Sequence, residues 1–457
     1  MKTADVVICG AGIAGISTAY YLAAKHGIKD VAIVDYRPPL TFTSDKSTEC
    51  YRNWWPGPGD TMVRFMNRSI DLLEQLADES DNYFGLNRRG YVFLTADPER
   101  ARSFVETANE ISMLGAGSVR SHESNISAYQ TAAVEGYKDQ PIGADIVLGS
   151  KNISAIFPFL ANDVVAMMHP RRCGWLSAQQ LGMYLLDKAR EHGARLIEGK
   201  ITSVETTSGK ISAVSVSTSK GTERISTNTF VNAAGPYIDE MGQLFGVKLP
   251  VFNELHGKIS FSDTLGLIPR DVPMMIWSDP VTLPWTREER EDLASYDETR
   301  WLTQTLPAGV HFRPEGLGKS SAILMLWTYD LEPQDIVWPP TFDQSYPEIV
   351  MRGLTRMVPS LSAYIERMGK PWVDGGYYCK TQENRPLIGP LPVPGSYIIG
   401  ALSGYGIMAS QAAAELLSMH ITGADLPVYA PQFMLERYED PEYQTLLEQW
   451  DATSGQL

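Results

Sequence analysis

Cysteine is scarce in this sequence, and none of it stands at a metal-binding spacing. The four cysteines, Cys9, Cys50, Cys173 and Cys379, are scattered over 457 residues without a C-x-x-C pair. A structural zinc site or a disulfide framework needs cysteines at short, regular spacings. The sequence therefore indicates neither a metal site nor disulfides, and it favours a protein of the reducing cytoplasm.

Long apolar runs and a surplus of basic residues are also lacking. No apolar run approaches the ~18 residues of a transmembrane helix, and "MKTADVV" leads directly into an expected strand, so we expect no signal peptide. A net charge of -15 disfavours nucleic acid and anionic membranes as partners. These absences predict a soluble protein, and its length suffices for two domains.

What the sequence does contain is a glycine-rich turn between a strand and a helix. The segment 5–10, "DVVICG", has the Val and Ile content of a buried parallel strand. Residues 14–27, "AGISTAYYLAAKHG", are rich in helix formers and end at a glycine. A second strand, "VAIVD" at 31–35, closes with an acid twenty residues after Gly15. Strand, turn, helix, strand and acid follow the order of a dinucleotide-binding unit.

Each glycine of "GAGIAG" has its own expected task. Gly10 makes the tight turn, Gly12 lets the backbone approach a pyrophosphate, and Gly15 brings helix and strand together. The diphosphate would lie on the free N–H groups at the helix start, where the dipole favours negative charge. Asp35 would bind a ribose hydroxyl, and an acid in place of arginine favours NAD or FAD over NADP. The alternative is a plain βαβ unit with a glycine turn.

Signals for a parallel sheet occur in three separate parts of the chain. They lie at the N-terminus, near 170–245 and after about 370. Helices are predicted at 60–80, at 97–115 and at 176–193, because each follows a capping Asp or Ser. Residues 286–301, "TREEREDLASYDETRW", are expected to form a charged, solvated helical insertion.

Segments of another kind separate these parts. Antiparallel strands are expected in "RRGYVFLTADP", "HGKISFSD", "GVHFRPEG" and "SSAILMLWTYD". We therefore predict an α/β protein, α+β overall, with two domains. A discontinuous Rossmann-like nucleotide domain comprises 1–85, 150–245 and 370–457, and a mixed antiparallel-sheet substrate domain comprises 86–149 and 246–369.

Four blocks together resemble one family of flavoproteins. They are "VVICGAGIAGISTAYYLA" with "VAIVD", "TFVNAAGPYIDEMG", "TQENRPLIGPLP" and "YIIGALSGYGIMASQAAAELLS". These blocks are similar to the D-amino-acid oxidase-like FAD-dependent oxidoreductases, which include glycine oxidase, sarcosine oxidase and the dimethylglycine dehydrogenases. The resemblance spans the chain and implies FAD as the cofactor of the Rossmann-like domain.

The resemblance and the glycine turn together predict the cofactor site. In the family, the helix that follows "SGYGIM" points its N-terminus at the flavin pyrimidine carbonyl and stabilises negative charge there. "NAAG" supplies small side chains where a cofactor must pass close to the backbone. The predicted cofactor residues are Gly10, Gly12, Ile13, Ala14, Gly15, Asp35, Tyr36, Ser44, Lys46, Ser47, Thr48, Ile201, Ala233, Ala234, Gly235, Gly404, Tyr405, Gly406, Ile407 and Met408.

The resemblance implies which residues contact the substrate, and several of these residues differ from the family pattern. Arg52 matches the sarcosine oxidase arginine that grips a substrate carboxylate, with an ion pair in the cofactor loop as the alternative. Tyr405 stands where relatives place His or Tyr over the flavin, so the resemblance implies that Arg52 and Tyr405 are the catalytic residues that contact substrate. Met408 replaces a family lysine, and Tyr378 replaces a glycine oxidase arginine. These departures favour a bulkier or less anionic amine.

Several aromatic and polar residues carry open alternatives. Trp54 and Trp55 would form an aromatic cage for a substituted ammonium group or lie in the core, and we favour the core. His256 is expected to be a strand histidine with satisfied hydrogen bonds. FAD is expected to be dissociable, with a covalent link through Cys379 as the alternative, since Tyr377 holds the family position. Around Ile323 the sequence is apolar where sarcosine oxidase has an oxygen-activating lysine, which predicts slow reaction with oxygen.

The implied function is oxidation of a C–N bond. We expect an FAD-dependent enzyme that oxidises a secondary or tertiary amine or amino acid, of the N-methyl or imino-acid type, by hydride transfer to flavin N5, giving an imine. The expected partners are this small molecule and O2 or another electron acceptor. Two alternatives are a flavoprotein subunit of a multi-subunit amine dehydrogenase complex, which would bind partner subunits, and, less favoured, a flavin monooxygenase.

Overall fold

The chain opens with the predicted strand, glycine turn, helix and strand. In the computed structural model, which describes residues 2–123, 126–316, 318, 320–448 and 450, β2 (Val6–Cys9) leads into α1 (Ile13–Tyr20), and β3 (Val31–Asp35) follows. The helix continues as a π-turn at Tyr21–Lys25 and stops before Gly27, whose φ is 71°. A left-handed φ favours glycine, which explains why the helix ends there.

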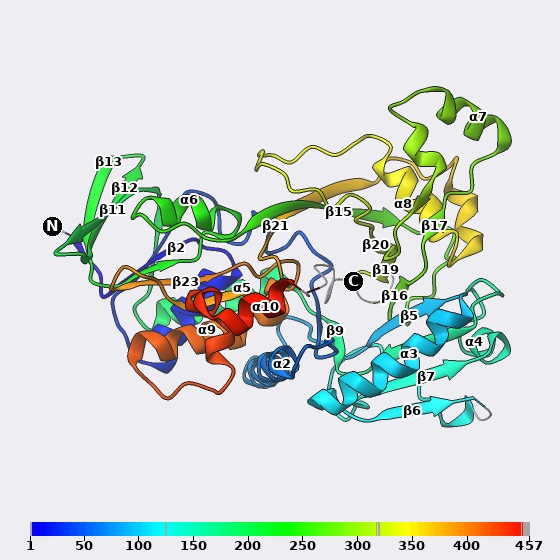
Figure 1. Ribbon diagram of the computed structural model, residues 1–457, viewed down its shortest axis with the longest axis horizontal. Coiled ribbons are helices and arrows are strands. Elements are labelled where there is room, and N and C mark those ends of the chain that lie inside the picture. The colour runs from blue at the N-terminus through cyan, green and yellow to red at the C-terminus, as the bar shows by residue number, and fades with distance from the viewer. Residues whose placement is uncertain (1, 124–125, 317, 319, 449, 451–457) are drawn as a thin grey trace.

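A six-stranded sheet at one end of the molecule contains this unit (Figure 1). Its order is β10-β3-β2-β14-β23-β22, and every neighbouring pair is parallel except β22 with β23. The added strands are β10 (Arg195–Glu198), β14 (Phe230–Asn232), β22 (Leu387–Pro390) and β23 (Ser396–Gly400). The three sequence regions with parallel-strand signals therefore meet in one sheet, as predicted.

The helices around this sheet include α2 (Thr61–Glu79), α5 (Ala178–Glu191), α6 (Ile238–Gln243) and α9 (Gly406–Thr422). Of these, α2 and α5 begin directly after the predicted capping residues Asp60 and Ser177. Ser177 accepts a hydrogen bond from the N–H of Gln180 at the start of α5. Asp60 precedes α2 but pairs with Arg64 instead of capping a backbone N–H. Helix α9 packs against both α1 and α2.

A nine-stranded mixed sheet forms the other end of the molecule (Figure 1). Its order is β21-β15-β20-β19-β16-β5-β8-β7-β6, and its pairs are antiparallel except β16 with β5 and β6 with β7. The strands are β5 (Tyr91–Thr95), β6 (Val119–His122), β7 (Ala144–Leu148), β8 (Ala166–Pro170), β15 (Phe252–Ser262), β16 (Met274–Trp277), β19 (His311–Pro314), β20 (Ala322–Leu326) and β21 (Trp372–Lys380). The four segments predicted as antiparallel strands are β5, β15, β19 and β20.

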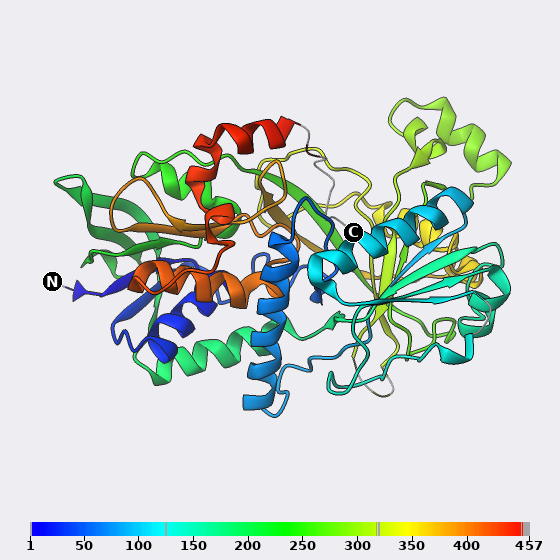
Figure 2. The same ribbon diagram turned by 60° about the horizontal axis from the view of Figure 1, so that its bottom comes forward.

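Helix α3 (Pro98–Ile111) lies along one face of this sheet, over β5, β7 and β8 (Figure 2). Asp97 caps it by accepting a hydrogen bond from the N–H of Glu99. Strands β8 and β21 belong to the nine-stranded sheet, although their residues fall within the ranges predicted for the nucleotide domain. Two large buried apolar clusters accompany the two ends.

The remaining strands form small sheets. One is the four-stranded sheet β1-β13-β12-β11, which contains β1 (Lys2–Thr3), β11 (Lys200–Thr207), β12 (Lys210–Thr218) and β13 (Gly221–Ser226). The others are the pair β4 (Cys50–Arg52) with β9 (Cys173–Trp175) and the pair β17 (Val281–Thr282) with β18 (Thr305–Leu306). Shorter helices are α4 (Ser150–Ile156), α8 (Tyr346–Leu354) and α10 (Pro441–Glu448).

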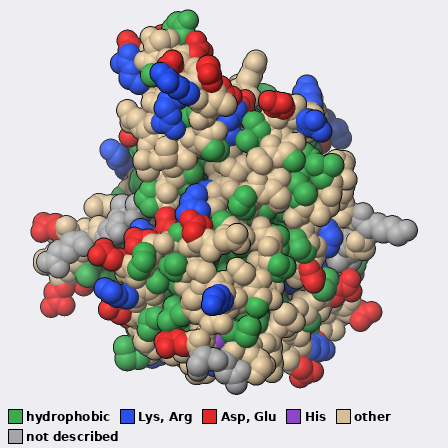
Figure 3. Space-filling view, turned by 90° about the vertical axis from the view of Figure 1, so that its right-hand side faces the viewer, with side chains coloured by type: hydrophobic (Ala, Val, Ile, Leu, Met, Phe, Trp, Pro, Cys, Tyr) green, Lys and Arg blue, Asp and Glu red, His purple; other side chains and the backbone are tan. Residues whose placement is uncertain are grey.

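The charged insertion forms a helix on the surface, as predicted. Helix α7 (Arg287–Ser295) has no buried residue and begins with a capping box between Thr286 and Glu289. Figure 3, which faces this end of the molecule, shows acidic and basic side chains on the protruding lobe at the top. One such pair is Arg287 with Glu291. Within the described part of the chain, no helix has both the length and the apolar character that a membrane span requires.

A buried ion cluster lies at the edge of the nine-stranded sheet. The Asp145 carboxylate, 2% exposed, accepts hydrogen bonds from Arg120 at 2.8 and 2.9 Å, from His122 at 2.8 Å, and from Arg171. Burial by itself raises the pKa of a carboxyl group, but these partners outweigh burial and hold the pKa of Asp145 below its usual range. The cluster joins β6, β7 and the turn after β8.

Candidate active site

Three cavities follow one another from the glycine turn to the nine-stranded sheet. The first lies beside the glycine turn and has a volume of about 470 Å³; we call it the turn cavity. A middle cavity of about 90 Å³ shares Gly12, Ser44 and Ala233 with it. The third, the aromatic cavity, measures about 530 Å³ and shares Tyr378 and Gly404 with the middle cavity. Because neighbouring cavities share wall residues, they adjoin in one row, and an extended ligand could follow it.

The glycine turn brings the backbone to the wall of the turn cavity. A Cβ on Gly10 would lie 2.3 Å from the Ala233 carbonyl oxygen, and one on Gly15 would lie 2.0 Å from the Gly10 carbonyl oxygen. These distances are far below van der Waals contact, so β2, α1 and β14 approach this closely only with glycine here. Gly12 precedes α1, and Ser44 accepts the N–H of Ile13 at 2.9 Å. The helix start is thereby held against the cavity wall.

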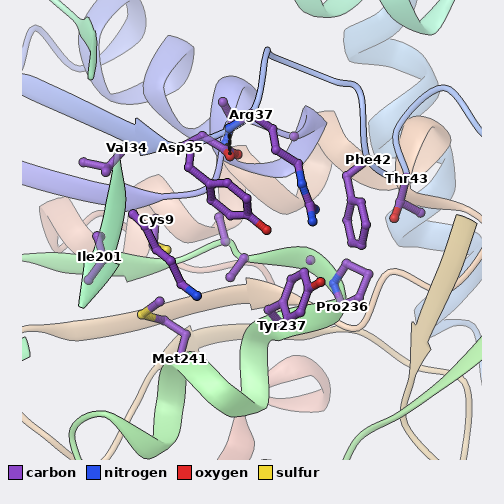
Figure 4. Close-up of a pocket in the computed structure, with 18 of the residues that line it drawn as sticks. Cys9, Val34, Asp35, Arg37, Phe42, Thr43, Ile201, Pro236, Tyr237 and Met241 are labelled. Carbon is purple, nitrogen blue, oxygen red and sulfur yellow. Dashed lines mark hydrogen bonds between the residues drawn. The ribbon is translucent and has the colours of Figure 1, made fainter. Parts of the chain in front are cut away.

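Asp35 ends β3 at the same cavity (Figure 4). Its carboxylate accepts the N–H of Ala11 at 2.8 Å and the N–H of Arg37 at 3.0 Å. A carboxylate has about four lone-pair sites, so two accepted bonds leave capacity for hydroxyl groups of a ligand. The geometry fits the ribose contact expected from the sequence.

Arg37 was missed by the sequence analysis and lies prominently in this cavity (Figure 4). Its guanidinium carbon lies 4.1 Å from the ring centre of Phe42 and 4.8 Å from that of Trp338. Phe42 also stacks on Tyr237 at 5.4 Å. A cation stacked among aromatic rings can contact an anionic or planar ligand. The sequence feature that could have revealed Arg37 is its position as a basic residue two places after Asp35, the acid that ends β3.

The start of α9 faces the middle and aromatic cavities. Gly406 and Ile407 line the middle cavity, and Met408 lines the aromatic cavity. The first backbone bond of the helix runs from the N–H of Ala409 to the Tyr405 carbonyl, so earlier N–H groups carry the partial positive charge of a helix start. This end of the helix can stabilise negative charge on a ligand in the middle cavity.

Almost all of the predicted cofactor residues line these cavities. Those in the turn or middle cavity are Gly10, Gly12, Ile13, Ala14, Asp35, Tyr36, Ser44, Ser47, Ile201, Ala233, Ala234, Gly235, Gly404, Gly406 and Ile407. Thr48, Tyr405 and Met408 line the aromatic cavity. Gly15 lines none of the three, because its role is the close approach to Gly10. Lys46 also stands apart, since its ammonium group pairs with Asp374 at 2.8 Å and with Asp45 at 3.2 Å.

Arg52 lies in the wall of the aromatic cavity at the end of β4. The residue is 5% exposed, and its guanidinium carbon lies 4.8 Å from the ring centre of Trp55 and 6.0 Å from that of Tyr91. Burial lowers the pKa of Arg52, although a guanidinium stays charged at neutral pH. A buried arginine at a cavity wall suits a carboxylate ligand.

The predicted aromatic residues divide between cavity and core. Tyr405 lines the aromatic cavity and donates its hydroxyl hydrogen bond to the Asn384 carbonyl at 2.7 Å. Trp55 packs edge-on against Tyr405 with ring centres 5.0 Å apart. Trp54 and Trp55 are 3% and 4% exposed and belong to the apolar core. The core alternative therefore describes both tryptophans, and the walls of the cavity come from other aromatic residues, Phe93, Phe104, Trp277 and Tyr378.

Two histidines also line the aromatic cavity. His256 has the hydrogen bonds expected of it, to Glu254 at 3.0 Å and to Thr328 at 2.8 Å, yet it faces the cavity as well. His311 was missed by the sequence analysis. It bonds the Gly309 carbonyl at 2.7 Å, and burial lowers the pKa of His311 to about 4. No local pattern in "GVHFRPEG" reveals that this strand end faces a cavity.

Cys379 lines the middle cavity but is a buried thiol. The residue is 5% exposed and belongs to an apolar cluster with Ile238 and Leu387. Burial raises the pKa of Cys379 to about 12, which disfavours the thiolate needed for attack on a ligand. Tyr377, which holds the family position, bonds the backbone of Val337 instead.

Known proteins resemble this chain over much of its sequence. The family model "FAD dependent oxidoreductase" matches residues 5–419. Human mitochondrial dimethylglycine dehydrogenase is 27% identical over 319 residues, which are 67% of this chain and 33% of that protein. A sarcosine oxidase subunit beta from Rhodobacter capsulatus is 26% identical over 218 residues, 46% of this chain and 48% of that one. The chain thus spans about a third of the length of the dimethylglycine dehydrogenase it matches.

Solved structures share the fold. L-proline dehydrogenase from P. horikoshii has a TM-score of 0.72 at 20% identity, covering 96% of this chain and 98% of that one. Glycine oxidase from Geobacillus kaustophilus has a TM-score of 0.71 at 16% identity, covering 96% and 99%. The glycine turn, the Asp35 carboxylate and the chain of cavities fit FAD. The chain therefore belongs to the family of FAD-dependent oxidoreductases, and it is an enzyme with FAD as its cofactor.

Proposed function

We propose that this protein oxidises the C–N bond of a secondary or tertiary amine or amino acid, of the N-methyl or imino-acid type, to an imine. The observation that carries the proposal is the buried Arg52 in a cavity that adjoins the cofactor path. The relatives support this substrate class by their names, since dimethylglycine and sarcosine are N-methyl amino acids and L-proline is an imino acid.

In this proposal Arg52 binds the carboxylate of the substrate. Its planar guanidinium can donate two parallel hydrogen bonds, which orient the substrate as well as hold it. The apolar walls, including Phe93, Phe104 and Trp277, would enclose the carbon skeleton and exclude water. The predicted cofactor residues Thr48, Tyr405 and Met408 also line this cavity of about 530 Å³, so substrate and cofactor would share its volume.

FAD, when bound, supplies the acceptor for the hydride that leaves the carbon next to nitrogen. The chain's own residues would hold it at both ends. Asp35 would accept from ribose hydroxyls, and the N–H groups at the start of α1 would meet the diphosphate. The start of α9 would stabilise negative charge at the flavin end.

Slow reaction with oxygen is part of the proposal. Ile323, where the family resemblance places an oxygen-activating lysine, is fully buried in the apolar cluster of the nine-stranded sheet. Photoreduced protein mixed with air is expected to reoxidise over seconds or longer. Reoxidation within milliseconds would contradict this and make the protein an efficient oxidase.

The test of the substrate class is an anaerobic screen followed by flavin absorbance. Sarcosine, dimethylglycine, proline and other cyclic imino acids, and D-amino acids would each be added to FAD-loaded protein. Bleaching of the flavin band by one of the amines is expected, with the imine or its hydrolysis products detected by mass spectrometry. Absence of bleaching by every amine and amino acid at every pH would refute the proposal.

A second candidate is a flavoprotein subunit of a multi-subunit amine dehydrogenase. It is favoured by the similarity to a sarcosine oxidase subunit beta and by the fraction of dimethylglycine dehydrogenase that the chain spans. Size-exclusion chromatography of the chain expressed alone, with an activity screen on an artificial electron acceptor, separates the two. A monomer or homo-oligomer that turns over amines with that acceptor supports the self-contained enzyme.

A further inference from the structure

Four polar side chains form one hydrogen-bonded chain that ends at the wall of the aromatic cavity. Lys380 on β21 donates to both carboxylate oxygens of Glu254 on β15, at 3.0 and 3.1 Å. Glu254 also bonds the Nε2 of His256 at 3.0 Å. The Nδ1 of His256 bonds the Thr328 hydroxyl at 2.8 Å. Lys380 and Glu254 are 2% and 4% exposed, so this chain is shielded from water along most of its length.

The chemistry of the groups fixes the direction of each hydrogen bond. Burial alone raises the pKa of a carboxyl group, but the bond from His256 and the charge of Lys380 outweigh burial and lower the pKa of Glu254. Glu254 is therefore a carboxylate, which can only accept, and His256 must donate from Nε2. Burial lowers the pKa of His256, so the ring is neutral and its Nδ1 is an acceptor. Thr328 consequently donates to His256, and its own oxygen still has a lone pair to offer.

The acceptor end of this chain faces the cavity. His256 and Thr328 both line it, and so does Tyr378, whose ring stacks on His256 with ring centres 4.0 Å apart and planes at 19°. This stacking, together with two hydrogen bonds, holds the imidazole in one orientation. The charged or titratable groups that face His256 are Glu254, Lys380, Tyr378 and, across the cavity, His311.

We propose that Thr328, His256 and Glu254 form a proton relay that takes the proton of a substrate ammonium group, while Lys380 keeps Glu254 ionised. The inference rests on the proposed amine oxidation. An alkylammonium has a pKa of about 10, so an amine arrives protonated at neutral pH. Its nitrogen must regain a lone pair before a hydride can leave the adjacent carbon, because that pair becomes the second bond of the imine.

The relay moves one proton from the substrate nitrogen to His256. The substrate N–H bond breaks and leaves its electron pair on nitrogen, while the proton binds the Thr328 oxygen. The hydroxyl proton of Thr328 passes at the same time to the Nδ1 of His256. The resulting imidazolium is stabilised by the Glu254 carboxylate, which stays ionised beside Lys380. After the imine has left, His256 returns the proton through Thr328 to water that enters the cavity.

Matched substitutions of Thr328 test the relay. Thr328→Val has nearly the same shape without the hydroxyl, and Thr328→Ser keeps the hydroxyl. At pH 7 we expect Thr328→Val to slow anaerobic flavin reduction by about 100-fold, the lower end for a lost acid–base group, and Thr328→Ser to remain within a few-fold. The Thr328→Val deficit should shrink above pH ~10, where the amine arrives neutral. Equal rates for the two variants, or a deficit independent of pH, would overturn the relay.

A second measurement does not depend on turnover. The chain has seven histidines, so ¹⁵N-histidine spectra of the FAD-loaded protein can be assigned with His256→Asn. We expect His256 to be neutral at pH 7, with its proton on Nε2. An imidazolium at pH 7, or a proton on Nδ1, removes the acceptor and refutes the relay even if amines reduce the flavin. If the spectrum is as expected but no amine reduces the flavin at any pH, the proposed function is refuted instead.

Discussion

Replacing Arg52 by methionine should remove the carboxylate contact of the substrate without emptying the site. Arg52 is 5% exposed, and its guanidinium lies over the Trp55 ring in the wall of the aromatic cavity. Methionine fills most of the volume of the arginine stem and leaves the apolar packing in place. The measured quantity is the rate constant of anaerobic flavin reduction divided by the substrate dissociation constant, followed by stopped-flow absorbance.

The size of the effect follows from the burial of Arg52. Removing one partner of a buried, hydrogen-bonded charge pair costs about 2–5 kcal/mol. Since 1.36 kcal/mol corresponds to a factor of ten, the ratio should fall by roughly 30- to 5,000-fold. Arg52→Lys keeps the charge but loses the planar fork, so its loss should be intermediate.

Arg100 provides the matched control. It lines the same cavity, but its side chain is 43% exposed and pairs with Asp279 at 3.2 Å. Exposed ion pairs contribute about 1 kcal/mol or less, so Arg100→Met should lower the ratio by no more than about five-fold. An amine that lacks the carboxylate should react equally with wild type and Arg52→Met. An equal loss for the amine with and without its carboxylate would show that Arg52 supports the structure and does not bind substrate.

Three further predictions concern the cofactor and the fold. Gly10→Ala should abolish flavin retention and lower the melting temperature, because its Cβ would lie 2.3 Å from a backbone oxygen. The control is Gly27→Ala, whose Cβ would have nothing within 4 Å. That variant should keep the flavin and lose about 1–2 kcal/mol of stability, because Gly27 has a left-handed φ. Cys379→Ser should leave the flavin content unchanged. Acid precipitation of the wild type should leave the yellow colour in solution, because the FAD is dissociable. Yellow colour that stays in the wild-type pellet and is missing from the Cys379→Ser pellet would show a covalent link through Cys379. Asp145 has a lowered folded-state pKa, so its stabilisation is fully present above the unfolded value of about 3.9, declines as pH falls below that value, and is lost as pH falls through the lower folded-state pKa. Denaturant titrations should therefore show Asp145→Asn markedly destabilised at pH 7 and closer to wild type near pH 3, and a deficit that does not change with pH would contradict this assignment.

Features set by neighbouring residues could be predicted from the sequence. The caps of α3 and α5, the stop at Gly27 and the glycine turn each depend on a few consecutive residues, and the structure has them where the patterns place them. Lys46 shows the limit of such reasoning. A lysine near a phosphate segment suggests a phosphate contact, but here it pairs with Asp374, which lies 328 residues further along the chain.

The residues that line the aromatic cavity are brought together by contacts between segments far apart in the chain. His256 was predicted to have satisfied hydrogen bonds, and it has them, but the same side chain also faces a cavity. Which face of β15 meets that cavity is decided by its pairing with β20 and β21. Arg37 and His311 were missed for the same reason, since their surroundings come from distant segments.

The sequence by itself predicted a dinucleotide-binding unit, the class of fold and parallel-strand signals in three separated segments. These follow from backbone conformation and from the periodicity of apolar residues, which act over a few positions, whereas FAD was implied by the resemblance to a flavoprotein family. Only the tertiary structure decided which side chains share the aromatic cavity, that Trp54 and Trp55 lie in the core, and that Lys380, Glu254, His256 and Thr328 form one chain. The physical reason is that hydrogen bonds and burial depend on distances in space, and those are set only when β15, β20 and β21 pair.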